Sequence, residues 1–160
     1  MKRFATTAPI SLSLDIAAGR IRVIAADRTD TTVEIRPADA ARSRDAKAAD
    51  RTTVEYAAGV LRIAGPVEKN PLVGPSGSVE VTVQVPTGSS VAAKAVAAEF
   101  RGVGRLGDVV CEGANGVVRI DEAASVRVTA HTGDVTVGHL TGPARISTGL
   151  GRVTIGTRNR

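Results

Sequence analysis

The segment HTGDVTVGHL, residues 131–140, decides the fold, because its VTVG returns as VTIG eighteen residues later. Through the second half of the chain, apolar residues recur every nine residues, with one interval of eight, and a second apolar column lies two residues after the first. Side chains two residues apart on a strand point to the same face, so both columns are predicted to face one core. The first column is Val91, Phe100, Val109, Val118, Val126, Val135, Ala144 and Val153, and the second is Ala93, Gly102, Cys111, Ile120, Val128, Val137, Ile146 and Ile155.

Glycines mark the corners between these strands. They fall two residues before the first column, where the backbone needs positive φ or has no room for a side chain. A nine-residue strand and turn cannot bury its apolar face alone, so successive units are predicted to stack as a β-solenoid. The eighteen-residue recurrence favours two strands per turn, and a three-sided coil with three such units per turn is the alternative. The corner glycines are Gly107, Gly116, Gly133, Gly142 and Gly151.

The first half of the chain has the pattern of antiparallel strands. Period-two alternation on both sides of an AAG turn predicts one hairpin over residues 10–25 and a second over residues 52–66. The same alternation predicts strands over residues 31–37 and 77–86. Strands of this kind place one face on a core and the other in water.

Two connections interrupt the strands. Residues 38–51 are alanine-rich and polar on all sides, so they predict a helical turn or a short helix at most. Residues 65–78 are rich in proline and glycine and are predicted to be a loop. We therefore expect an all-β chain, with an antiparallel hairpin region over residues 1–86 and β-solenoid repeats over residues 87–160, forming one continuous unit.

The composition excludes several classes of protein. Only three residues, Phe4, Tyr56 and Phe100, are aromatic, so the core must be thin. The single cysteine excludes an intrachain disulfide, and no apolar run approaches the ~18 residues of a membrane helix. Without a continuous signal-type apolar stretch near the N-terminus, a cytoplasmic location is expected. The net charge of +5 is dispersed, which is typical of a solvated surface rather than of nucleic-acid binding.

The strand-repeat pattern resembles a bacterial family described as β-strand-repeat "putative adhesins", common in actinobacteria. The resemblance covers about Phe4 to Gly156 and is strongest in VEVTVQVPTGSSV (residues 79–91) and GDVTVG (residues 133–138). It implies an all-β, solenoid-like fold and no established enzymatic activity. Members of the family continue for several more repeats, so this chain is either naturally short or a fragment.

The clustered polar residues His131, Asp134 and His139 are interpreted as structural. The two histidines end successive strands, and aspartate is a common residue after a corner glycine. A metal site needs three or four converging ligands. We therefore expect no metal at this segment.

The remaining candidates for chemistry also have structural explanations. Cys111 lies in the second core column, where a cysteine acts as a small hydrophobe. Ser89 and Ser90 lack the G-x-S-x-G context of a nucleophile. Glycines 102, 104 and 107 match a dinucleotide-binding spacing, but strands flank them on both sides and no helix follows. We expect no catalytic residue and no cofactor.

The residues between the two columns point outward and include several arginines. On an eighteen-residue coil, Arg101 and Arg119 would stack on one face and Arg127 and Arg145 on the other. These short basic ladders could meet an anionic polymer or an acidic partner. Without aromatic platforms, single-stranded nucleic acid is not the expected partner.

The sequence therefore favours a non-enzymatic structural or protein-interaction module. If nothing covers Val153 and Ile155 at the end of the coil, the unpaired backbone there is expected to bind a protein partner or a second copy of the chain. The alternative is a polar-ligand or carbohydrate site, for binding or processing, on a face of the coil. Such a site would show carboxylates or exposed aromatics in register, which the sequence lacks.

Overall fold

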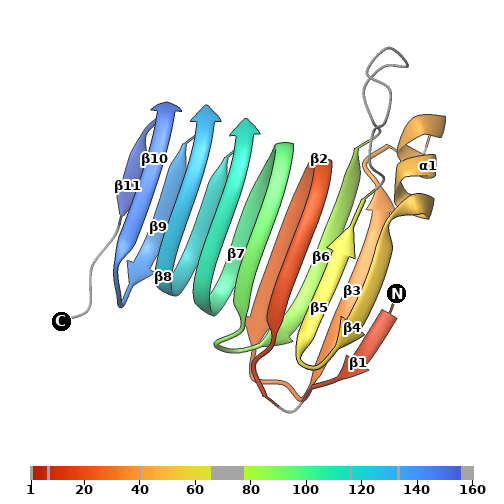
Figure 1. Cartoon of the computed structure of the whole chain (residues 1–160), viewed down its shortest axis with the longest axis horizontal. Coiled ribbons are helices and arrows are strands. Elements are labelled where there is room, and N and C mark those ends of the chain that lie inside the picture. Colours follow the sequence, from red (N-terminus) through yellow and green to blue (C-terminus); the bar gives the residue numbers. More distant parts are fainter. Residues whose placement is uncertain are drawn as a thin grey trace.

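The structure is a computed structural model and describes residues 2–6, 8–39, 41–65, 78–115, 117–132 and 134–155. Within these ranges the chain folds into eleven strands and one helix (Figure 1), which confirms the expected all-β class. The elements are β1 (Lys2–Ala5), β2 (Ser11–Ala26), β3 (Asp30–Pro37), α1 (Ser43–Arg51), β4 (Thr53–Ala57), β5 (Val60–Ala64), β6 (Val79–Pro86), β7 (Ser90–Asn115), β8 (Val118–Thr132), β9 (Val135–Leu140), β10 (Ala144–Leu150) and β11 (Val153–Ile155).

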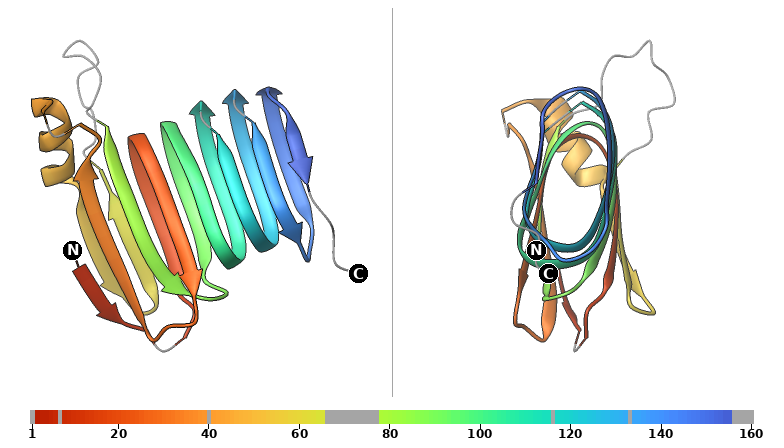
Figure 2. Two further views of the ribbon diagram at one scale, coloured as in Figure 1. Left: turned by 180° about the vertical axis from the view of Figure 1, so that it is seen from behind. Right: turned by 90° about the vertical axis from the view of Figure 1, so that its left-hand side faces the viewer.

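All of these strands belong to one sheet, which curls into a nearly closed, barrel-like wall. The strand order is β1-β3-β6-β2-β7-β8-β9-β11, while β10 pairs with β8, and β5 pairs with β2 and β4. Seen along the long axis, the chain traces a flattened ring (Figure 2, right). The predicted β-solenoid stays a prediction, because the observed wall is described equally well as a flattened barrel.

Parallel pairing over a nearly constant offset builds the second half of this wall. Phe100 pairs with Val118, and Val118 pairs with Val135. Val135 then pairs with Val153. Each of these steps along the chain is seventeen or eighteen residues long, so one circuit holds two strands. A three-sided coil is not observed in the described residues.

The hairpin expected over residues 52–66 is confirmed, but the one expected over residues 10–25 is wrong. In the first, β4 and β5 pair antiparallel through a two-residue turn in which Ala58 and Gly59 both have positive φ. In the second region, β2 is one continuous bent strand that pairs in parallel with β5, β6 and β7. Its middle residue, Gly19, turns a corner of the ring, and a Cβ there would lie 1.8 Å from the carbonyl oxygen of Val79. The chain thus continues around the ring at this AAG instead of reversing.

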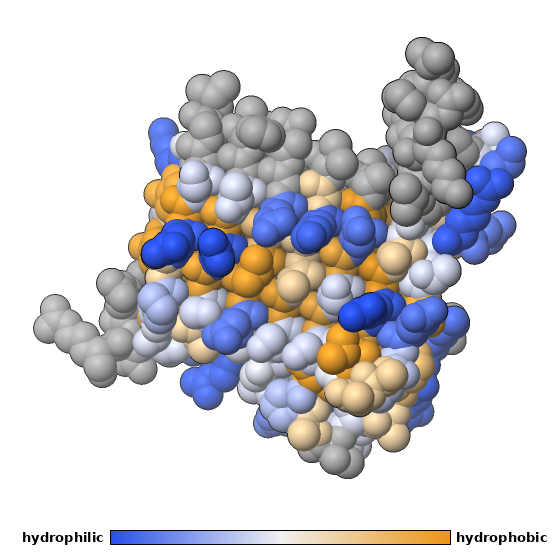
Figure 3. All heavy atoms as spheres, viewed as in Figure 1, coloured by the Kyte–Doolittle hydropathy of each residue, from blue (hydrophilic) through white to orange (hydrophobic). Residues whose placement is uncertain are grey.

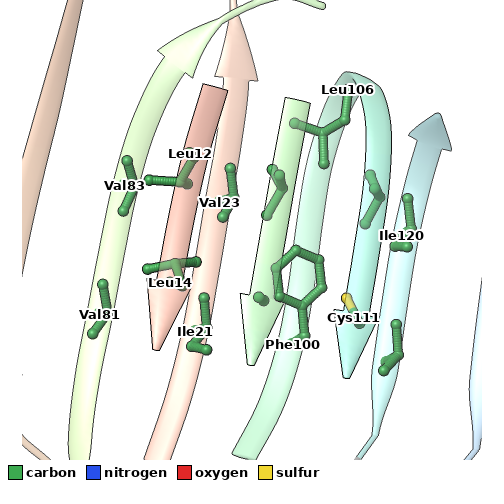
Figure 4. Close-up of a cluster of buried hydrophobic side chains, with 14 of the residues drawn as sticks. Leu12, Leu14, Ile21, Val23, Val81, Val83, Phe100, Leu106, Cys111 and Ile120 are labelled. Carbon is green, nitrogen blue, oxygen red and sulfur yellow. The ribbon is translucent and has the colours of Figure 1, made fainter. Parts of the chain in front are cut away.

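A single cluster of small aliphatic side chains fills the ring. Both halves of β2 contribute to it, through Leu12 on one side and Val23 on the other, beside Phe100 and Cys111 of β7 (Figure 4). The two predicted core columns are confirmed from Val91 to Val137, because every member in that interval is buried. The predicted strands 31–37 and 77–86 correspond to β3 and β6, whose alternate residues are buried.

The last circuit departs from the predicted columns. Val153 and Ile155 are 41% and 37% exposed, although their partners Val135 and Val137 are buried. Ala144 is exposed and Ile146 is half-buried. The period-two pattern places these side chains correctly in register, but no further circuit among the described residues lies against them.

Two of the predicted corner glycines, Gly107 and Gly142, are required by a lack of room. A Cβ at Gly107 would lie 2.6 Å from the carbonyl oxygen of Gly88, and one at Gly142 would lie 2.2 Å from that of Ala124. Either contact is too close for a side chain to fit without a backbone shift. The predicted corners at 116 and 133, and residues 66–77 of the predicted loop, lie outside the described residues.

The stretch 38–51 contains α1, a fuller helix than the sequence predicts. The helix packs on β3 and β6, with Ala48 in the core cluster. Asp45 is buried, and its carboxylate accepts hydrogen bonds from the backbone N–H groups of Asp39 (3.1 Å) and Ser78 (2.8 Å). These tertiary contacts stabilise a helix that has little apolar surface of its own.

Candidate interaction surfaces

Three arginines lie side by side on the face formed by β6, the second half of β2, the middle of β7, the first half of β8, β9 and β11. Arg22 pairs in register with Arg101, and Arg101 with Arg119. Threonines continue the same line in both directions. We call this line the arginine row; in order it contains Thr82, Arg22, Arg101, Arg119, Thr136 and Thr154.

The three arginines of the row are exposed. Among the residues the structure describes, no carboxylate lies within ion-pair distance of Arg22, Arg101 or Arg119. Two residues away, Arg20 reaches both Glu80 (3.9 Å) and Glu99 (3.6 Å). Within the described residues, the row is therefore a line of positive charges without carboxylate partners, and it lies beside Arg20, whose charge is compensated by two glutamates.

A shallow pocket adjoins the row. It has a volume of about 300 Å³ and is lined by Glu99, Phe100, Arg101, Val117 and Arg119. Val117 is 37% exposed and gives the pocket an apolar side, while the two guanidinium groups give it a cationic side. The Glu99 carboxylate at its rim is paired with Arg20. The pocket can thus accept a group that has both an anionic and an apolar part.

The opposite face carries the second predicted ladder, which is shorter. Arg127 and Arg145 are exposed and pair in register, as the eighteen-residue period requires. The next residue in this line is Val110, which pairs with Arg127, so the positive charge stops after two side chains. Figure 3 shows the face formed by β10 and the later parts of β7 and β8, where hydrophilic spots are separated by apolar surface.

The C-terminal end of the strand stack, which we call the open end, exposes apolar side chains and strand edges. It consists of β10 and β11 with Val153 and Ile155 (Figure 1). Within the described part of the chain, β10 pairs with β8 alone and β11 with β9 alone. Each of these two strands therefore leaves one row of backbone N–H and C=O groups without a neighbouring strand.

The other end of the stack is covered. Phe4 and Tyr56 stack across it with their ring centroids 5.3 Å apart and pack on the core cluster. The edge strand β1 is tied to β3 by Asp30, whose carboxylate contacts the Nε atoms of Arg28 and Arg3 at 2.6 Å each. The hydrogen bond from Arg28, followed by that from Arg3, lowers the pKa of Asp30 despite an opposing effect of burial. The stacked rings of Phe4 and Tyr56 cover the core at this end, and the ion pairs of Asp30 hold the edge strand β1 in place.

The structure does not assemble a metal site around His139 and Asp134. His139 Nε2 lies 3.8 Å from Glu122 Oε1, while Asp134 Oδ1 accepts a hydrogen bond from the backbone N–H of Arg152 at 2.9 Å. The side chain of His131 lies outside those that the structure describes. In the described ranges, no three histidine, cysteine or carboxylate side chains come together as metal ligands do.

The other candidates for chemistry have structural surroundings. Cys111 is buried, and burial raises the pKa of its thiol to about 12, so its reactive thiolate is suppressed. Ser89 is also buried; its hydroxyl donates to the carbonyl oxygen of Pro86 (2.7 Å) and accepts from the N–H of Ile10 (3.0 Å). Ser90 begins β7, and Gly102, Gly104 and Gly107 lie within the same strand; the described residues that follow contain strands and no helix.

Of the arginine row, the sequence predicts only Arg101 and Arg119 as an interaction surface, and it does not place Arg22 and Thr82 near them. The sequence predicts a hairpin around Arg22 and an antiparallel strand around Thr82, and so places neither beside the repeats. Arg22 precedes Arg101 by more than four eighteen-residue periods and is out of phase with them. A signal is nevertheless present, because the alternation of Ile21 and Val23 about Arg22 matches that of the later repeats.

Solved structures share this fold at low sequence identity. A "putative cell adhesion protein" from Clostridium sporogenes superposes with a TM-score of 0.64 at 11% identity, over 99% of each chain. A "putative adhesin" from Parabacteroides distasonis superposes with a TM-score of 0.58 at 19% identity; the match covers 99% of this chain and 65%, less than two thirds, of that one. No protein-family model and no curated protein matches the sequence. No helix in the described ranges is long and apolar enough to cross a membrane. The similarity shows a common all-β fold.

Proposed function

We propose that the chain is a non-enzymatic interaction module that binds a second copy of itself through its open end. The exposure of Val153 and Ile155 carries this proposal. The same two positions one circuit earlier, Val135 and Val137, are 1% and 0% exposed. A covering partner would remove comparable apolar area from water, which favours association by about 25 cal/mol per Å².

The backbone at the open end supports the same partner. An edge strand offers unpaired N–H and C=O groups to another strand, and Thr154 and the neighbouring residues of β11 carry no acidic side chain that would oppose pairing. The covered end, with its stacked Phe4 and Tyr56, has no comparable exposed aliphatic pair among the described residues. Edge strands lie at both ends, since β1 pairs with β3 alone and β4 with β5 alone in the described residues, so it is the exposed aliphatic pair that distinguishes the open end.

We further propose that the stacked circuits are a β-solenoid and that the chain belongs to the β-strand-repeat adhesin group. The nearly constant offset between paired strands, one circuit at each step, supports the solenoid. The fold shared with two proteins described as adhesion proteins supports the group. A non-enzymatic role is consistent with the buried Cys111 and Ser89. The expected cytoplasmic location stays a prediction.

Replacing Val153 and Ile155 together by lysine tests the open end. Sedimentation velocity over a wide concentration range should show the unmodified chain shifting from monomer to a larger species, and the double variant should stay monomeric. Charge repulsion and the loss of apolar contact both oppose association in the variant. Val117→Lys is the matched control, because Val117 is as exposed as Ile155 but lies on the side of the stack; it should associate like the unmodified chain.

Two results would contradict this proposal. One is a monodisperse monomer of the unmodified chain at the highest concentration that stays in solution. The other is equal association of the unmodified chain and the double lysine variant, which would place the contact elsewhere. Circular dichroism of both variants is the check that their strand content is retained.

A further inference from the structure

We propose that the arginine row binds a linear anionic polysaccharide, one that carries a carboxylate or sulfate group on successive sugar residues. The row runs along the stack, perpendicular to the strands, and consists of three guanidinium groups flanked by threonine hydroxyls. It lies on a side of the stack, so this inference goes beyond the proposed association at the open end and does not depend on it.

The unpaired charges are the first argument. Like charges on neighbouring strands disfavour pairing, and sheets commonly avoid them or add an acidic neighbour. Here Arg20 has two such neighbours, Glu80 and Glu99, whereas Arg22 and Arg101 have none among the described residues. Exposed charges on neighbouring strands repel only weakly in water, so the row is tolerated. An anion laid along it would turn this repulsion into attraction.

The distance between neighbouring arginines of the row matches the distance between charges along an extended polyanion. Neighbouring strands lie ~4.8 Å apart, so the five intervals of the row span ~24 Å. The distance between neighbouring strands is close to the length of one sugar residue in an extended polysaccharide. Duplex DNA carries one charge per ~1.7 Å of its axis, which is far denser than the row. An acidic β-strand presents like-facing side chains every ~6.7 Å, which is wider than the row.

The threonines favour a ligand rich in hydroxyl groups. Thr82, Thr136 and Thr154 continue the row at the same strand interval, and the last two are exposed. A threonine hydroxyl both donates and accepts hydrogen bonds, as sugar hydroxyls do. Single-stranded nucleic acid is bound through exposed aromatic side chains. Of the three aromatic residues here, Phe4 and Tyr56 stack on each other and Phe100 is buried.

The pocket beside the row fits the same ligand. Val117 provides an apolar wall next to Arg101 and Arg119, and the one carboxylate in the lining, that of Glu99, is paired with Arg20 at 3.6 Å. The carbon face of a sugar ring can lie on such a wall while its carboxylate reaches a guanidinium group. Arginine suits this role because its planar fork of donors pairs with both oxygens of a carboxylate.

Two double variants of equal charge test the proposal. The pair Arg101→Gln/Arg119→Gln removes two neighbouring charges from the row, and the pair Arg127→Gln/Arg145→Gln removes two neighbouring charges from the opposite face. Binding of an oligosaccharide of six uronic acid residues is measured by titration calorimetry at low ionic strength. The row variant should bind at least ~10-fold more weakly than the unmodified chain, since each charged hydrogen bond is commonly worth about tenfold. The opposite-face variant should bind within about twofold of the unmodified chain.

A charge-neutral variant separates a sugar site from a merely basic surface. Thr136→Val keeps the size and charge of the side chain but removes the hydroxyl, and should weaken uronate binding several-fold while leaving its salt dependence unchanged. The proposal would be overturned if the unmodified chain did not bind the uronate, or if the two arginine pairs weakened its binding equally. It would also be overturned if a single-stranded oligonucleotide or a hexaglutamate peptide of equal charge, or a neutral six-residue glucan, bound more tightly than the uronate. The lysine variant at the open end adds two positive charges beside Thr154 and leaves the arginines in place, so it should bind uronate no more weakly than the unmodified chain, and failure of one proposal leaves the other intact.

Discussion

At the scale of single residues, Cys111 gives a pH-dependent prediction. Its folded pKa is raised to about 12 from an ordinary value of 9.0, because burial penalises the thiolate. Between these values the unfolded chain loses the thiol proton and the folded chain keeps it. Stability contributed by the neutral thiol is therefore present below pH 9 and falls as the pH rises above it, by at most ~1.4 kcal/mol per pH unit.

Urea unfolding of the unmodified chain and of Cys111→Val, at a series of pH values from 8 to 11, checks this expectation. The variant lacks the titrating group, so its stability should fall less steeply with pH than that of the unmodified chain. If the free energy of unfolding fell equally with pH in the two proteins, the thiol of Cys111 would not be buried in its neutral form. As an independent measure, a thiol reagent at pH 8 should modify Cys111 only after unfolding.

The residue scale also shows how far the fold can be predicted from the sequence. The period alone predicts Val109, Val118 and Val135 in the core, and all three are buried. Two-residue alternation and a nine-residue period are sufficient here because each strand repeats the same contact with the strand before it. The exposure of Val153 was not predictable, since the pattern of a strand contains no information about whether another strand covers it.

At the scale of single elements, β2 and α1 were harder to predict than the repeats. An AAG between alternating segments is compatible with a hairpin and with a corner, because both need the same local residues; only the pairing of distant strands distinguishes them. The sequence predicts only part of the arginine row for this reason, since Arg22 lies in the bent strand β2. The full length of α1 is not evident from its own residues because the helix depends on Asp45, whose partners are far away in sequence or outside the helix.

Asp45→Ala therefore should destabilise the fold through α1. The substitution leaves the N–H groups of Asp39 and Ser78 without their carboxylate acceptor, which we expect to cost ~1–3 kcal/mol of unfolding free energy. Urea unfolding followed by circular dichroism provides the measurement. Asp50→Ala, at a more exposed position on the same helix, is the control and should change stability by less than ~0.5 kcal/mol. Equal effects of the two substitutions would show that Asp45 does not anchor the helix.

At the scale of the whole molecule, one core and one sheet connect the two halves of the chain. The strand β2 pairs with β5 and β6 from the first half and with β7 from the second. The buried cluster extends without interruption from Ile10 to Leu140. We therefore expect residues 1–86 and 87–160 to unfold together.

Calorimetry of Leu12→Ala and Leu140→Ala tests this cooperativity. Both leucines are 1% exposed, so each substitution should cost ~2–5 kcal/mol. A single heat-absorption peak should move to lower temperature in both variants. Two peaks, with each variant moving only its own, would show that the halves are separate folding units.

The nearly constant offset between paired strands has a consequence for how such a chain can change in length. Duplication of one whole circuit would lengthen the stack by a single strand interval of ~4.8 Å and keep every side chain on its original face. Insertion of half a circuit would instead shift all later strands to the opposite wall and break the line of guanidinium groups. Insertions that lengthen this chain therefore keep the outward-facing residues on their original faces only when they add whole circuits.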